Sequence, residues 1–265
     1  MQETPPREQA ARLDRLISLL DARVTAPAGV ADKQKVFRAL MNLHSGDGLS
    51  PEFFALQDAE LREQNETKGR VELSEIPPSP LSPHLRLWRG DITRLAVDAI
   101  VNAANRQLLG CFHPLHNCID NIIHSGAGLQ LRAECRRLMR AQAHEEPAGS
   151  AKITRAYNLP ARWVLHTVGP IVEGPGPTPL QCRQLASCYT SCLELARRHG
   201  LKSVAFCCIS TGVFHFPQEL AARIAVEAVR GFLRERHFDT VVFDVFTDAD
   251  ENLYRALLRQ RNGRA

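Results

Sequence analysis

Residues 97–105 read Val97-Asp98-Ala99-Ile100-Val101-Asn102-Ala103-Ala104-Asn105. The apolar centre, 99–101, suits a buried strand, and the asparagines that follow it favour a turn. Apolar runs of strand length also occur at 85–88, 163–168, 203–208 and 240–246, and stretches with helical spacing lie between them at 128–140, 180–199 and 219–235. Such alternation predicts an α/β fold with a largely parallel sheet covered by helices on both faces.

The segment before residue 84 has a different pattern. Apolar residues recur at helical spacing over 13–20 and 36–43, which predicts two or three short helices. Four prolines in 75–83 disfavour helix and predict an extended connector. We therefore divide the chain into a helical N-terminal extension with its connector, 1–84, and an α/β domain, 85–265.

The composition limits the classes of function. The 265 residues are 44% hydrophobic, enough for one sizeable core, and the net charge of +4 is too small to predict nucleic-acid binding. No apolar run approaches the ~20 residues that span a bilayer, and the polar start does not resemble a signal peptide. We expect a cytoplasmic protein in which the eight cysteines are free thiols or metal ligands.

Polar turns follow three of the predicted strands. They are Gly90-Asp91-Ile92-Thr93, Asn102-Ala103-Ala104-Asn105 and Ser210-Thr211-Gly212-Val213-Phe214. Any one of them is as readily a simple turn. Three at the ends of three strands predict a ligand site at that edge of the sheet, and the Ser-Thr-Gly loop offers the backbone N–H groups that a pyrophosphate needs.

A different chemistry is indicated by residues 110–121. Two cysteines and two histidines lie within eight residues: Cys111, His113, His116 and Cys118. Thiolate and imidazole are the preferred ligands of zinc, so we expect a metal site in this loop. The alternative is a pair of buried thiols beside unrelated histidines.

These segments, together with 123–124, 127–128, 134–135 and 166–170, resemble the macrodomain family from residue 85 to about 258. The resemblance implies a three-layer α/β/α fold that binds ADP-ribose at the strand ends. Asp91 would accept the adenine amino group with Ile92 beside the base, and Asn105 would contact the distal ribose. The other expected ligand contacts are Asn121 and the diphosphate loop of Ser210, Thr211, Gly212, Val213 and Phe214.

Most macrodomains have a run of glycines where this chain has 110–121. The loop resembles that of a zinc-containing, MacroD-type subgroup of small bacterial proteins with a helical N-terminal extension and a His-Phe-Pro sequence, here 215–217, after the Ser-Thr-Gly loop. Its Cys-x4-His-x-Cys spacing implies Cys111, His116 and Cys118 as ligands, with His113 outside the set or as a fourth ligand. Three ligands would leave a position open, which is typical of catalytic zinc.

The resemblance implies a protein-ADP-ribose hydrolase. It would cleave the N- or O-glycosidic bond between mono-ADP-ribose and a protein side chain, through oxocarbenium-like charge. Zinc would polarise the ribose hydroxyls or the attacking water. Asp120 would orient or deprotonate the water, and Asn105 would fix the ribose. Asp120 could instead be a helix N-cap.

Other interpretations stay open at this point. The chain could be an ADP-ribose reader with a structural zinc, or the metal loop and the arginines of 132–140 could dock nucleic acid or a partner. A solvated helix face is the ordinary explanation for those arginines. We expect a mono-ADP-ribosylated protein as partner, with a lipoyl-carrier protein modified by a sirtuin-like transferase as one candidate, and neither nucleic acid nor membrane. The N-terminal helices could pack on the domain, close over the site or recruit the modified protein.

Overall fold

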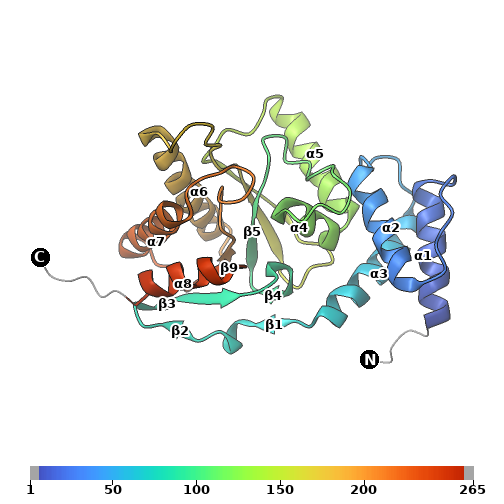
Figure 1. The fold of residues 1–265 in the computed structure, drawn as a ribbon, viewed down its shortest axis with the longest axis horizontal. Coiled ribbons are helices and arrows are strands. Elements are labelled where there is room, and N and C mark those ends of the chain that lie inside the picture. The colour runs from blue at the N-terminus through green and yellow to red at the C-terminus, as the bar shows by residue number, and fades with distance from the viewer. Residues whose placement is uncertain (1–5, 260–265) are drawn as a thin grey trace, which may run out of the picture.

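The computed structural model describes residues 6–259, and a seven-stranded sheet lies at its centre (Figure 1). The strand order is β2-β3-β9-β8-β5-β7-β6. The five inner strands are parallel, and the two edge strands, β2 and β6, are antiparallel to their neighbours. In this order the strands are β2 (Pro78–Ser79), β3 (Ser82–Arg89), β9 (Thr240–Val245), β8 (Ser203–Phe206), β5 (Ala99–Ala103), β7 (Trp163–Thr167) and β6 (Ala151–Arg155).

Helices cover both faces of the sheet. One layer contains α6 (Pro179–Arg198), α7 (Gln218–Glu235) and α8 (Asp248–Leu257), with α7 in contact with both of the others. The other contains α4 (Ile119–Ala127) and α5 (Leu129–Gln142). Local signals set the helix starts: Thr178 and Gln181 form a capping box at α6, where Pro179 occupies the first turn. The predicted three-layer α/β/α arrangement with a mostly parallel sheet is confirmed.

The N-terminal extension is a bundle of three helices, α1 (Pro6–Leu20), α2 (Val30–Leu43) and α3 (Pro51–Lys68). Its core is separate from that of the sheet and includes Leu16, Phe37 and Phe53. Leu129 of α5 also belongs to this core. The extension is therefore packed against the α/β domain, and that domain completes its apolar interior.

The connector joins the two parts through short backbone pairings. β1 (Val71–Glu72) pairs in parallel with β4 (Leu95–Ala96), and the short helices η1 (Leu73–Glu75) and η2 (Ile92–Arg94) flank these strands. β3 already begins at Ser82, so the last connector residues belong to the sheet. Among residues 6–259, no helix is both long and apolar enough to cross a membrane.

Two differences from the sequence analysis bear on the site. The strand predicted over 203–208 ends at Phe206, because the chain turns into a loop in which Ser210 has a φ of 66°. The arginines predicted as a solvated face of 132–140 include Arg132, which is only 2% exposed. Its guanidinium donates to the carbonyl oxygens of Met41, Asn42 and His44 at the end of α2. The expectation of a solvated face is therefore wrong for Arg132.

Candidate active site

The predicted turns meet at one edge of the sheet because the strands before them are parallel. Ala103 of β5 lies opposite Thr167 of β7, and Phe206 of β8 lies opposite Phe243 of β9. The segments after β3, β5, β7, β8 and β9 therefore leave the sheet at its carboxyl edge, where α/β proteins bind ligands.

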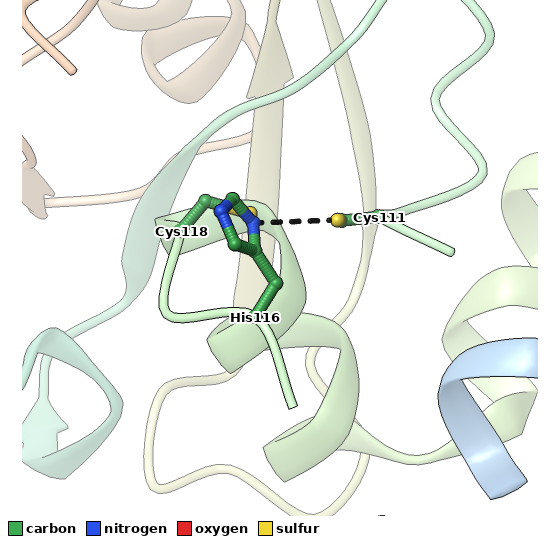
Figure 2. Close-up of side chains that lie close together, drawn as sticks. All are labelled: Cys111, His116 and Cys118. Carbon is green, nitrogen blue, oxygen red and sulfur yellow. Dashed lines mark hydrogen bonds between the residues drawn. The ribbon is translucent and has the colours of Figure 1, made fainter. Parts of the chain in front are cut away.

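The segment predicted to bind metal, residues 110–121, is called the metal loop below and leaves this edge after β5. The ligand atoms of Cys111, His116 and Cys118 all lie within 4.8 Å of one another. Figure 2 shows the three side chains converging, with His116 Nδ1 3.5 Å from Cys111 Sγ. His116 is exposed, whereas the two cysteines are half-buried. The sequence prediction that these three residues come together is thus matched by the geometry.

The thiol and imidazole donors are of the kind that zinc prefers, and one pair of them has the spacing of a zinc site. In a tetrahedral site with Zn–S of about 2.3 Å and Zn–N of about 2.0 Å, the sulfur and nitrogen lie about 3.5 Å apart. The separation of Cys111 Sγ and His116 Nδ1 equals that value. Burial, helped by negative charge at Cys111 and Asp120, raises the pKa of the Cys118 thiol to about 11. A bound cation would offset this penalty, because coordination deprotonates a thiol.

His113 lies outside the cluster, and its ring centroid is 6.0 Å from that of His116. A second group of donor atoms is buried beneath the loop: His124, Cys135 and His166. His166 is already engaged there, since its Nε2 lies 2.8 Å from Thr154 Oγ1 and its Nδ1 lies 3.2 Å from Asn102 Nδ2. Burial lowers the pKa of His166 to about 3. We therefore assign His166 to the packed core, which leaves the exposed loop as the candidate metal site.

Asp120 lies two residues beyond Cys118, in the first turn of α4. Its carboxylate accepts hydrogen bonds from Asn102 Nδ2 at 2.8 Å and Asn105 Nδ2 at 3.3 Å. The N-cap of α4 is Cys118, whose sulfur accepts from the backbone N–H of Asn121, so Asp120 does not cap the helix. Burial raises the pKa of Asp120 from 3.8 to about 6, although the bond from Asn102 lowers it.

The loop and Asp120 are close because glycine occupies position 110. Gly110 has a φ of 78°, and a Cβ there would lie 2.8 Å from the ring of His124. Its carbonyl accepts from Asn105 Nδ2 at 3.0 Å. Asn105 thus joins the end of β5, the start of the metal loop and the carboxylate of Asp120.

Asn121 is fully buried, with its side chain directed at the loop. Its Nδ2 donates to the carbonyl oxygens of His113 at 2.9 Å and Cys111 at 3.4 Å. Its Oδ1 accepts from Ser125 Oγ of the next helical turn at 3.1 Å. These bonds fix the position of the backbone that carries the candidate metal donors.

The loop over 210–214 forms a closed turn after β8. Ser210 is buried with a left-handed φ, and its Oγ has no hydrogen-bond partner among residues 6–259. Phe216 donates its backbone N–H to Ser210 O at 3.0 Å, which closes the loop. Thr211 and Phe214 are half-buried, whereas Gly212 and Val213 are exposed at the loop tip. Such a turn leaves backbone N–H groups available for phosphate oxygens.

Asp91 and Ile92 lie at the far end of the same edge, after β3. The Asp91 carboxylate accepts from Thr93 N and Thr93 Oγ1, and one of its oxygens lies 3.4 Å from Lys68 Nζ of α3. Ile92 is buried. The carboxylate is partly exposed, which leaves it accessible to a ligand.

Several residues near the site were not predicted. Asn102 lies in the quoted 97–105 motif, and its bond to Asp120 could have been anticipated from that motif. Arg38 and Asn42 of α2 bond to the metal loop from more than seventy residues away, and no sequence pattern signals this. His124 is buried with its Nε2 3.6 Å from the Asp120 carboxylate.

Comparisons with known proteins agree with this geometry. The Macro domain family model matches residues 101–225. A protein-ADP-ribose hydrolase from Treponema medium is 49% identical over 231 residues, covering 86% of this chain and 88% of the relative. One from Staphylococcus aureus strain MSSA476 is 46% identical over 230 residues, with 86% of each chain covered.

Solved structures show the same fold. The Trypanosoma brucei macrodomain in complex with ADP-ribose has a TM-score of 0.65 and 33% identity, covering 83% of this chain and 94% of that one. The Oceanobacillus iheyensis macrodomain with ADP has a TM-score of 0.60 and 37% identity, covering 66% of this chain and 90% of that one. The fold and its carboxyl-edge site define a macrodomain-type α/β protein. The chain belongs to the Macro domain family.

Proposed function

We propose that this protein is a zinc-dependent protein-ADP-ribose hydrolase that removes mono-ADP-ribose from modified protein side chains. Two relatives named protein-ADP-ribose hydrolase match this chain over most of their own length, and this match supports the hydrolase activity. The observation that carries the zinc dependence is the convergence of Cys111, His116 and Cys118. The last of them, Cys118, lies two residues before Asp120. Zinc held by these three donors would supply positive charge that polarises a ribose hydroxyl or water.

The chain's own side chains divide the remaining work. The loop over Ser210, Thr211, Gly212, Val213 and Phe214 would bind the diphosphate, with Asp91 and Ile92 at the adenine and Asn121 and Asn105 at the distal ribose. Asp120 would hold the attacking water and accept its proton at a carboxylate oxygen. The amides of Asn102 and Asn105 orient that carboxylate, and its raised pKa suits proton acceptance near neutral pH.

The test is a release assay on proteins that carry mono-ADP-ribose through Asp/Glu, Ser, Arg or Cys linkages. We expect the zinc-loaded wild type to release ADP-ribose from at least one linkage and Cys118→Ala to lose zinc and turnover together. Asp120→Ala should lose turnover but keep ADP-ribose binding, as measured by calorimetry. Cys182→Ala is the matched control, because Cys182 is a free, half-buried thiol on α6, outside the cluster.

Two results would overturn parts of the proposal. ADP-ribose binding without release from any linkage would favour a reader with a structural zinc. Equal loss of binding and turnover in Asp120→Ala would remove Asp120 from the catalytic step. For the physiological substrate, we propose a cytoplasmic mono-ADP-ribosylated protein, with a lipoyl-carrier protein modified by a sirtuin-like transferase as the first candidate. The linkage assay can be extended to that protein.

A further inference from the structure

The metal loop is bonded to a helix of the N-terminal extension, although the two lie far apart in the sequence. Arg38 of α2 donates through Nη2 to His116 O at 2.8 Å and to Asn121 Oδ1 at 2.9 Å. The first acceptor is the carbonyl of a metal-donor residue. The second belongs to the side chain that holds the carbonyl oxygens of Cys111 and His113.

Asn42, one turn further along α2, contacts the same loop from another direction. It is 1% exposed, and both ends of its amide are used. Its Oδ1 accepts from Leu115 N at 2.9 Å, and its Nδ2 donates to Ser125 Oγ of α4 at 2.9 Å. Because Ser125 in turn donates to Asn121, the amide of Asn42 connects Leu115, within the loop, to Asn121 at its end.

Arg132 holds the end of α2 in the position that these contacts need. Its buried guanidinium donates to the last carbonyl groups of α2, where a cation also suits the helix dipole. The ring of Phe112, inside the metal loop, lies 4.5 Å from the same guanidinium. The loop is therefore held between α2, α4 and α5. The hydrogen bonds from α2 add to those that the α/β domain itself makes to the loop.

We infer that Arg38 and Asn42 are positioning residues for the metal loop, so that the N-terminal extension sets the affinity of the site for zinc. This inference rests on the proposed function for its metal. Residues that hold ligands from outside a metal site typically change metal affinity or activity about 10–100-fold when replaced. The extension thereby contributes to the reaction through the metal loop.

The first experiment measures zinc affinity by chelator competition for the wild type, Arg38→Ala, Asn42→Ala and Lys35→Ala. Lys35 is the matched control, since it lies on α2 but is exposed and paired with Asp32 of its own helix. We expect Arg38→Ala and Asn42→Ala to bind zinc about 10–100-fold more weakly. Their kcat should fall at limiting zinc with KM little changed, and excess zinc should restore it. Arg38→Lys, which keeps a donor for His116 O, should recover part of the affinity.

A second measurement does not depend on zinc. In metal-free protein, hydrogen exchange at the Leu115 amide should be faster in Asn42→Ala than in the wild type, because its acceptor is gone. ADP-ribose affinity and the thermal midpoint report whether each variant is folded.

The outcomes separate the two ideas. Unchanged zinc affinity in Arg38→Ala and Asn42→Ala, with unchanged Leu115 exchange in Asn42→Ala, overturns the positioning role. A parallel loss of zinc binding, ADP-ribose binding and thermal stability also overturns it, because it would indicate unfolding alone. If the wild type fails to bind zinc, the proposed function fails, and the exchange measurement still decides whether α2 holds the loop. Weaker zinc binding with intact ADP-ribose binding supports the inference.

Discussion

Replacing Gly169 by alanine should displace the loop that we assign to the diphosphate. A Cβ at position 169 would lie 2.0 Å from Ser210 Oγ and 2.9 Å from Ile209 Cγ2. Rotation of the serine hydroxyl could relieve the first contact only, and Ile209 is fully buried. Because heavy atoms repel inside about 3.5 Å, the loop must shift by roughly 1 Å. Overpacking of this kind costs about 1–3 kcal/mol.

Two measurements would record this shift. At about 2–4 °C per kcal/mol for a chain of this size, the thermal midpoint should fall by roughly 2–12 °C. ADP-ribose affinity, measured by calorimetry, should fall about tenfold if the shift removes one hydrogen bond of about 1.4 kcal/mol to the diphosphate.

The control is Gly174→Ala, in the same segment after β7. A Cβ there meets nothing within 4 Å. We therefore expect its midpoint and affinity to match those of the wild type. Equal midpoints and equal ADP-ribose affinities for Gly169→Ala and Gly174→Ala would refute the close packing of Gly169 on Ser210.

Three further predictions concern Asp120, Asn65 and the metal. Since burial raises the pKa of Asp120 from 3.8 to about 6, its ionised form destabilises the folded protein above pH 6, and this cost disappears below about pH 4. In urea unfolding of the metal-free protein at about pH 7.5, the free energy of unfolding of Asp120→Asn should exceed that of the wild type by up to about 3 kcal/mol. A difference that persists at about pH 3.5 would contradict this cause. The free energy of unfolding of Asn65→Ala should be about 1–3 kcal/mol lower in the same assay, because Asn65 Nδ2 donates to Asn158 O and Gly126 O. An unchanged midpoint would show that water replaces the lost donor. Chelation should abolish ADP-ribose release while calorimetry still detects ADP-ribose binding, and added zinc should restore release; turnover in fully metal-free protein would exclude the metal role.

The elements with a clear local periodicity of apolar residues could be predicted from the sequence. The five parallel strands alternate with amphipathic helices, so their order of appearance predicted the central sheet and both helix layers. The edge strand β6 was missed because the sequence Ala151–Arg155 mixes polar and apolar residues and is only partly buried. α4 was anticipated only through the possible N-cap at Asp120, because its nine residues are short and contain Gly126. Weak periodicity and short length hide such elements.

The site shows the same division between local and distant information. Cys111, His116 and Cys118 lie within one short loop, so their spacing alone could predict that they meet. The contacts from Arg38 and Asn42 depend on how α2 packs against α4, and that packing is set by apolar residues elsewhere in both parts. Nothing in the local sequence around Arg38 and Asn42 indicates that these residues contact the metal loop.

The position of β3 in the sheet has a consequence for how the chain is made. Leu85 pairs with Val241, so β3 lies beside a strand that is synthesised long after it. While the ribosome is still translating the segment between them, β3 lacks its parallel neighbour and β8 lacks β9. The helices α1, α2 and α3 emerge before these strands and can collapse around a core that lacks only Leu129 of α5. A chain halted before Thr240 would leave two open strand edges, the kind of surface that recruits chaperones or aggregates.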